Sequence, residues 1–184
     1  MGSTYYEKLI RTVIDNSEED TWKEAVEEWK ILDCEEDQTA SSSCICGKEN
    51  IRYLYTIKNV VNGNLLYPIG SSCITKFERA DLKEEISVRE GMFKLLHAIQ
   101  ANNYISLTAD LFSRKLLKHL FDEGAFHSNQ YNAYSGENDY QFLVKMFNKR
   151  DKSSISDAQK KKIRAIIVSS IKPYLVELLG KKIR

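Results

Sequence analysis

The fold of this chain is decided by the stretch Cys44-Ile45-Cys46-Gly47 and by its continuation at Gly70-Ser71-Ser72-Cys73-Ile74. The chain has four cysteines, and the remaining one, Cys34, lies ten residues before the first pair. Thiolates are soft ligands, and four of them suit a tetrahedral Zn²⁺ ion. We therefore predict a structural zinc site at Cys34, Cys44, Cys46 and Cys73. The alternative is four reduced, buried thiols without a metal.

The segment between the cysteines predicts a β-hairpin. Apolar and polar side chains alternate from Ile51 to Lys58, which indicates a strand. Asn62-Gly63 is a strong hairpin signal, because both residues tolerate a positive φ. The return strand is expected from Leu65 to Ile69. Pro68 lacks an N–H, so this strand either ends near Pro68 or lies at the edge of the sheet. Cys73 then falls near the start of a new helix.

A Cys-x-Cys-Gly turn, a hairpin and a ligand on the first turn of a helix resemble a treble-clef zinc finger. Such a finger usually takes two ligands from the helix start. Here the positions where a second helical ligand is expected are occupied by Gly70 and Lys76, so the helix supplies only one ligand, Cys73. Cys34 is the natural replacement for the missing ligand.

The longer run from Cys44 to Phe77 resembles a group of small phage and mobile-element proteins. The shared motifs are Cys-x-Cys-Gly and Gly-Ser-x-Cys-Ile-x-Lys-Phe, and they cover about 35 residues. This resemblance implies a zinc-binding module but no particular activity. Some small phage proteins of this size act against host defence systems.

Composition predicts a globular protein of the cytoplasm. The 184 residues are 42% hydrophobic and 29% charged, and they suffice for one domain or two small ones. No apolar run approaches the 18 or so residues of a membrane-spanning helix, so no membrane partner is expected. The N-terminus has no signal-peptide core.

We predict an α+β fold, mostly helical, in which a zinc-stapled, treble-clef-like β-hairpin precedes a helical bundle. The expected segments are an acidic helical one at 1–33, a zinc-binding hairpin module at 34–79 and a helical domain with a basic C-terminal helix at 80–184. Thr21 is expected to cap a helix that carries Trp22 and Trp29 on one stripe. Further helices are expected over 108–123 and, behind a capping box, from Ser156.

The net charge of +1 conceals a strong polarity along the chain. Residues 1–37 hold 12 acidic and 4 basic residues, a net charge of −8, and residues 143–184 hold 12 basic and 3 acidic residues, a net charge of +9. Such asymmetry indicates charged partners. Alternatively, the two ends lie against each other, or both are ordinary solvated faces. The acidic run Glu35-Glu36-Asp37 is expected to be solvated.

Aromatic and amide side chains interleave from Phe126 to Phe147, and basic residues follow directly. Aromatic rings can stack on bases while lysines contact phosphates. The expected nucleic-acid-binding residues are Tyr131, Tyr134, Lys149, Arg150, Lys152, Lys160, Lys161, Lys162 and Arg164. The alternative is an ordered loop whose tyrosines pack against neighbouring helices.

Sequence motifs give no indication of an enzyme. The chain lacks a Walker loop, a dinucleotide-binding glycine fingerprint, His-Glu-x-x-His and Gly-x-Ser-x-Gly. Four thiolates also close the coordination sphere, whereas catalytic zinc keeps one position open. We therefore predict a phage or mobile-element accessory protein that binds nucleic acid and uses zinc for folding. The alternative is a protein-binding inhibitor or adaptor, for example an anti-defence protein such as an anti-CRISPR, whose acidic surface meets a basic host protein.

Overall fold

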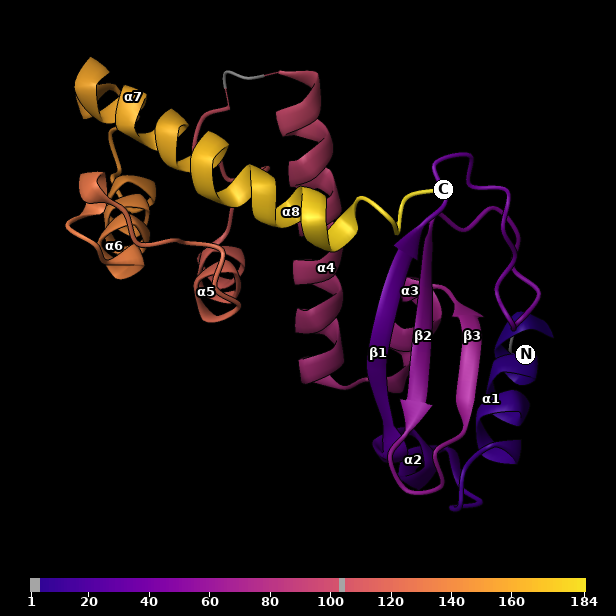
Figure 1. Cartoon of the computed structure of the whole chain (residues 1–184). Coiled ribbons are helices and arrows are strands. Elements are labelled where there is room, and N and C mark those ends of the chain that lie inside the picture. The colour runs from indigo at the N-terminus through magenta and orange to yellow at the C-terminus, as the bar shows by residue number, and fades with distance from the viewer. Residues whose placement is uncertain (1–3, 103–104) are drawn as a thin grey trace. The chain divides into compact units, whose positions relative to one another are not determined.

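The computed structural model describes residues 4–102 and 105–184, and the chain forms two compact units (Figure 1). Unit 1 runs to Arg89 and regains Lys181–Arg184, whereas unit 2 runs from Glu90 to Gly180. The architecture is α+β with more helix than strand, which confirms the predicted fold class at that level. Across the described residues, no helix combines the length and the apolar character needed to cross a membrane.

Unit 1 is built on a three-stranded antiparallel sheet with the order β1 (Trp29–Glu36), β2 (Tyr53–Asn59) and β3 (Leu65–Ile69). Cys34 lies opposite Tyr55, and Tyr55 lies opposite Ile69, so these three buried side chains share one face. The predicted hairpin joins β2 to β3, and Gly63 in its turn has a φ of +81°. β3 is an edge strand, where Pro68 is tolerated as expected.

The helices of unit 1 are short apart from the first and the last. They are α1 (Thr4–Asp15), α2 (Trp22–Ala25), α3 (Ser71–Ile74) and the beginning of α4 (Ala80–Ala101), with 3₁₀ turns at Val26–Glu28 and Thr75–Phe77. The prediction that one helix carries both Trp22 and Trp29 is wrong. Trp29 begins β1, where it pairs with Asn59, and its fully buried indole donates a hydrogen bond to Ser17 Oγ at 2.9 Å.

The last four residues of the chain lie along β1. Glu36 N–H donates to the carbonyl of Lys182, and Arg184 N–H donates to the carbonyl of Glu36, both at 2.8 Å. The side chains match this pairing, because Lys182 forms an ion pair with Asp33 and Arg184 forms one with Glu35. The acidic and basic ends of the sequence therefore lie partly against each other, which is one of the two alternatives to a charged partner.

Two carboxylates at the end of β1 are buried, so the expectation of a solvated Glu35-Glu36-Asp37 cluster is wrong. Glu36 is fully buried and pairs with Arg52 at 2.7 Å. Asp37 is 6% exposed and accepts hydrogen bonds from Thr39, Ser41 and Ser42 in the loop that leads to the cysteines. Partners of this kind offset the cost of removing a charge from water.

Asp37→Asn is expected to lower the melting temperature at neutral pH. The hydroxyls of Thr39 and Ser42 hold the pKa of Asp37 well below its usual 3.8. A carboxyl whose pKa is depressed by folding stabilises the protein at pH values above its unfolded pKa, and this stability is lost as the pH falls below it. The substituted amide would also turn N–H donors toward the N–H groups of Ser41 or Ser42.

Thermal unfolding from neutral pH down to about pH 2 checks this, because the difference between wild type and Asp37→Asn should shrink below about pH 4. Asp20→Asn, a change at an exposed acid of the same unit, is the control and should follow the wild type. A constant difference at all pH values would contradict the prediction.

Unit 2 holds the remaining helices, namely α5 (Arg114–Asp122), α6 (Gly136–Phe147), α7 (Asp157–Ile166) and α8 (Lys172–Leu179), with 3₁₀ turns at Gln130–Asn132 and Lys152–Ser154 and a π-helical turn at Ile167–Ile171. The capping box between Ser156 and Gln159 is confirmed. The π-helical turn lies just before Pro173, where the missing N–H disturbs regular helix pairing.

The helix expected over 108–123 begins later, because Ser113 caps α5 by accepting from Leu116 N–H at 3.0 Å. Gly124, with a φ of +80°, follows the end of α5 as predicted. The predicted apolar stripe of the C-terminal helices is buried, and it consists of Ile163, Ile166, Ile167, Ile171 and Leu175.

Candidate functional site

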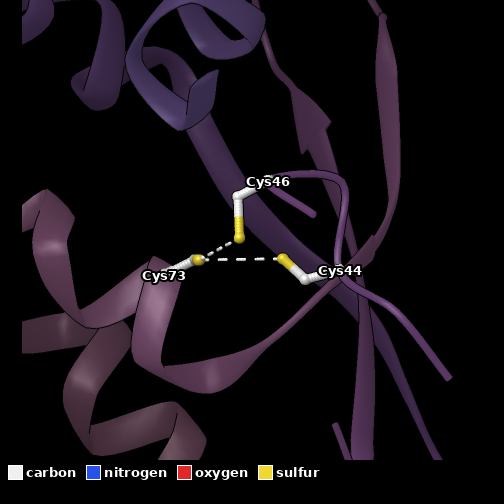
Figure 2. A group of neighbouring side chains, drawn as sticks. All are labelled: Cys44, Cys46 and Cys73. Atoms are coloured by element: carbon white, nitrogen blue, oxygen red, sulfur yellow. Dashed lines mark hydrogen bonds between the residues drawn. The ribbon is translucent and has the colours of Figure 1, made fainter. Parts of the chain in front are cut away.

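Three of the four cysteines come together in unit 1. Cys44 and Cys46 lie in the loop between β1 and β2, Cys73 lies in α3, and their sulfur atoms point toward one another (Figure 2). Cys73 Sγ lies 3.6 Å from Cys44 Sγ and 3.4 Å from Cys46 Sγ, and all three thiols are buried. In a tetrahedral zinc site with Zn–S bonds of about 2.3 Å, the sulfurs stand about 3.8 Å apart. The group has the ligands and the spacing to hold a metal ion.

The local sequence explains how the group forms. Gly47 has a φ of +93°, a conformation that other residues rarely adopt, and its N–H donates to the carbonyl of Cys44 at 2.7 Å. The intervening Ile45 N–H donates to the carbonyl of Pro68 at 2.9 Å, which fastens the turn to β3. Cys73 is the third residue of α3, and its N–H donates to the carbonyl of the N-cap residue Gly70 at 2.9 Å, so the end of β3 positions the third sulfur.

Backbone N–H groups also point at the sulfurs. Gly70 N–H donates to Cys44 Sγ at 3.3 Å, and Lys48 N–H donates to Cys46 Sγ at 3.4 Å. The close contact between the two sulfurs lowers the pKa of Cys44 and raises the pKa of Cys73, because only one thiol of such a pair readily loses its proton. The two N–H groups therefore favour negative charge on the sulfurs of Cys44 and Cys46, and the thiolate is the form that binds metal.

Cys34 is not placed with this group, although the sequence predicts it as the fourth ligand. Its thiol lies 3.7 Å from the carbonyl of Glu35, in β1. Tyr55 of β2 stands between Cys34 and Ile69 of β3, so two strand spacings, about 10 Å, separate Cys34 from the strand that leads to Gly70. None of the four cysteines forms a disulfide, and among the described residues no further cysteine, histidine or carboxylate joins the group of three.

The second candidate site lies on α7 in unit 2. A hollow of about 430 Å³ opens on one flank of this helix, and Tyr131 stands at it with 84% of its surface exposed. Lys161 and Lys162 contribute the positive charge, and the ammonium of Lys162 lies 4.6 Å from the ring centre of Phe142. The other lining residues are Asn129, Asp139, Ala165, Ile166 and Ser169.

A dense set of hydrogen bonds holds the loop that carries Tyr131. The Asn129 side chain accepts from Tyr131 N–H, and the buried Asn132 amide donates to Asp139 and to the carbonyl of His127, each at 2.8 Å. Tyr134, 75% exposed, has a φ of +58°, which is unfavourable for a bulky residue. The loop is therefore held in one strained form that presents two tyrosines to solvent, a feature that is common at binding sites.

Other aromatic residues of this segment pack inside unit 2, which agrees in part with the alternative of tyrosines that pack against neighbouring helices. Tyr140 and Phe142 belong to α6, which begins at Gly136. The ring of Tyr140 stacks on Phe121 at 4.5 Å with an angle of 13°, and Phe126 is 8% exposed. The second half of this segment is therefore helical and contacts α5 through Tyr140.

The predicted basic residues divide between the flanks of α7 and the turn before it. Lys152 donates to the carbonyls of Met146 and Phe147 at the end of α6, and Lys149 donates to the carbonyl of Ser154 at 3.2 Å. Arg150 is exposed. Lys160 and Arg164 lie on the flank of α7 opposite the Tyr131 hollow and, with Lys152, line a second hollow.

Comparison with known proteins gives no relative: no family model matches the chain, and no curated protein or solved structure is significantly similar to it. The function therefore has to be inferred from two features of the structure, the cysteine group of unit 1 and the Tyr131 hollow of unit 2.

Proposed function

We propose that this protein is a small accessory protein of the cytoplasm that binds nucleic acid, of the phage or mobile-element type that its sequence resembles. The observation that carries the proposal is the exposed ring of Tyr131, which shares a hollow with Lys161 and Lys162. An exposed aromatic ring can stack on a base, and lysines beside it can neutralise the adjoining phosphates. Because hydrogen bonds already fix the loop, little conformational entropy is lost on binding.

The distribution of acidic residues supports this function over an acidic surface that binds a host protein. Glu28, Glu36 and Asp37 are buried, and Asp33 and Glu35 pair with the C-terminal residues. Five of the twelve acidic residues at the N-terminal end are therefore buried or paired within unit 1. The lysines of the Tyr131 hollow, in contrast, are exposed.

We also propose that the metal is Zn²⁺, held by the thiolates of Cys44, Cys46 and Cys73. Soft thiolate ligands with sulfur–sulfur distances of 3.4 and 3.6 Å suit a tetrahedral ion of this kind. The ion would join the Cys44–Gly47 turn to α3 and thereby hold the loop between β1 and β2. We propose a structural role for the ion, in which water takes the fourth position that the three thiolates leave open, and we place the nucleic-acid surface in the other unit.

Fluorescence anisotropy with labelled single- and double-stranded DNA and RNA at low salt tests the binding. We expect the double variant Lys161→Gln/Lys162→Gln to bind single strands more weakly, irrespective of sequence, and to reduce the slope of log affinity against log salt by about 1.4. The double variant Lys30→Gln/Lys83→Gln removes the same charge from exposed positions of unit 1 and should bind like the wild type. Absence of binding to every oligonucleotide would refute the proposal and favour a protein partner.

Stacking is tested at the two exposed tyrosines. We expect Tyr131→Ala to weaken binding by roughly 1–3 kcal/mol, because it removes the ring on which a base stacks. Tyr131→Phe keeps the ring and should retain most of the affinity. Tyr134→Ala is the matched comparison, since Tyr134 is similarly exposed but does not line the hollow. Equal effects of the two alanine variants would show that the hollow does not hold a base.

A further inference from the structure

A buried carboxylate, that of Asp139, lines the Tyr131 hollow of unit 2. Only 5% of the Asp139 surface is exposed, and its Oδ2 accepts a hydrogen bond from the Asn132 amide at 2.8 Å. No other described residue donates to this carboxylate, so its second oxygen, Oδ1, is left without a partner among them. Every fully buried polar side-chain atom of the described residues does have a partner. Oδ1 is therefore not fully buried, and the surface on which Asp139 opens is that of the hollow.

Hydrogen bonds hold this carboxylate and the loop of Tyr131 in a fixed relation. Asn132, which donates to Asp139, belongs to the same 3₁₀ turn as Tyr131, Gln130–Asn132. At the start of this turn, the Asn129 side chain accepts from Tyr131 N–H at 2.8 Å. Both sides of the hollow are thus ordered before a ligand arrives, which reduces the conformational entropy lost on binding.

The surroundings of Asp139 indicate which ligand chemistry suits the hollow. A carboxylate oxygen that is largely removed from water is costly unless a hydrogen-bond donor meets it. The protein supplies one donor to Asp139, and no described cation forms an ion pair with it. A ligand that enters the hollow therefore gains most if it brings N–H donors to this point. Lys161 and Lys162 of the same hollow are exposed cations, and they favour a ligand that also carries negative charge.

We propose that the Tyr131 hollow is selective for guanine among the bases of a single strand. The proposal rests on the nucleic-acid function proposed for this hollow. Guanine presents two neighbouring donors, N1–H and N2–H, on its Watson–Crick edge, and one carboxylate can accept both. Adenine, cytosine, thymine and uracil each present an acceptor beside their donor, and this acceptor would meet the negative carboxylate. Guanine is therefore the one common base that satisfies Asp139 with two hydrogen bonds.

The dimensions and charge of the hollow suit one unpaired base. Its volume of about 430 Å³ lies in the usual range of small-molecule pockets. A base whose Watson–Crick edge meets Asp139 cannot be paired at the same time, so the strand must be single at this point. The guanidinium of an arginine in a protein partner would offer the same two donors, but Lys161 and Lys162 repel a cation and therefore favour guanine.

Fluorescence anisotropy with the full chain and short thymidine strands that differ only in their central base tests the proposal. The strand with a central guanine should bind at least about fivefold more tightly than the strands with adenine, cytosine or thymine. Hypoxanthine lacks only the N2 amino group of guanine, so a strand with central hypoxanthine should lose most of this preference. 7-Deazaguanine keeps the Watson–Crick edge and should bind like guanine.

Asp139→Asn tests whether this carboxylate reads the base. The amide oxygen of the substituted side chain can still accept from Asn132, which turns its NH₂ group toward the donors of guanine. We expect the preference for guanine to disappear, while strands without guanine bind as they do to the wild type. Glu137→Gln is the matched control, because it removes the same charge from an exposed position of α6 and should keep the preference.

Several outcomes would overturn the selectivity, and they differ in what they leave standing. Equal affinity of the wild type for all central bases, or a hypoxanthine strand that binds as tightly as the guanine strand, would leave the proposed nucleic-acid function intact. A preference that persists in Asp139→Asn, or an equal loss of affinity for every strand in this variant, would give Asp139 a structural role only. Absence of binding to every strand would overturn both proposals and would leave an arginine of a protein partner as the matching donor.

Discussion

Cys46→Ser is expected to release the metal and to lower the stability of unit 1 by about 4 kcal/mol, when free zinc stands about a thousandfold above its dissociation constant. The substitution replaces one of three clustered sulfurs with a weaker ligand and removes the acceptor of Lys48 N–H. Because zinc binds the folded arrangement of ligands, loss of zinc affinity is also loss of folding free energy.

Metal analysis of protein purified without chelator gives the first measurement, and about one zinc per chain is expected for the wild type. Chelator should lower the melting temperature of the wild type but not that of Cys46→Ser. Cys34→Ser is the matched control, since Cys34 is an equally buried cysteine of the same unit that lies outside the group. We expect this control to keep its zinc and its sensitivity to chelator.

Zinc content and the response of the melting temperature to chelator distinguish two ways in which the proposed three-cysteine zinc site could be wrong. A wild type without zinc, whose melting temperature does not respond to chelator, would leave the cysteines as ordinary buried thiols. Loss of zinc from Cys34→Ser would instead restore Cys34 as the fourth ligand predicted from the sequence, and would require β1 to approach the turn at Cys44.

Gly136→Ala is expected to destabilise unit 2 by about 3 kcal/mol, a typical cost of forcing extra atoms into a packed site. A Cβ at Gly136 would lie 2.2 Å from the carbonyl oxygen of Phe126. This oxygen belongs to the backbone, so the start of α6 and the segment at Phe126 would have to move apart. The loop with Tyr131 lies between these two points in the sequence and would move with them.

Gly91→Ala provides the control for this prediction. Gly91 lies within α4, and a Cβ there would meet only Leu116 Cδ2, at an ordinary contact distance of 3.8 Å. Alanine is the better helix former, so this variant should gain up to about 1 kcal/mol. Chemical denaturation measures both changes, and oligonucleotide binding by Gly136→Ala should fall with its stability. A Gly136→Ala variant as stable as the wild type would contradict the prediction, because it would show that the segment between Phe126 and Gly136 can move without loss of folding free energy.

The parts of the fold that depend on local sequence could be predicted. The β2–β3 hairpin follows from alternating side chains and Asn62-Gly63, and the start of α7 follows from the Ser156 capping box. In each case, residues close in sequence supply the interactions that define the element. The buried stripe of α7 and α8 was predictable for the same reason, since it follows from the helical period alone.

The errors arise where distant residues decide the outcome. Trp29 fits a helical stripe, but it becomes part of β1 because β2 offers it a pairing partner. Glu36 and Asp37 look solvated in sequence, but Arg52 and the hydroxyls of Thr39 and Ser42 satisfy them in the interior. Local charge and periodicity carry no information about such partners.

In the candidate sites, too, the features set by local sequence were predictable and those set by distant residues were not. The Cys-x-Cys-Gly turn and Cys73 were predictable as partners, whereas the position of Cys34 depends on the register of β1 against β2. The second hollow on α7 could not be predicted, because it is lined by segment 105–108 together with residues that lie more than 40 positions later. The same holds for Asn132, whose role depends on its hydrogen bond to Asp139.

The connectivity of the two units has a consequence for how such a chain can evolve. Unit 1 contains both the residues before position 90 and the last four, so unit 2 is inserted between two segments of unit 1. The backbone pairing of Lys182 and Arg184 with Glu36 involves only residues of unit 1. An exchange of the coding segment for unit 2 would therefore leave both segments of unit 1, with the sheet and the three clustered cysteines, unchanged in sequence.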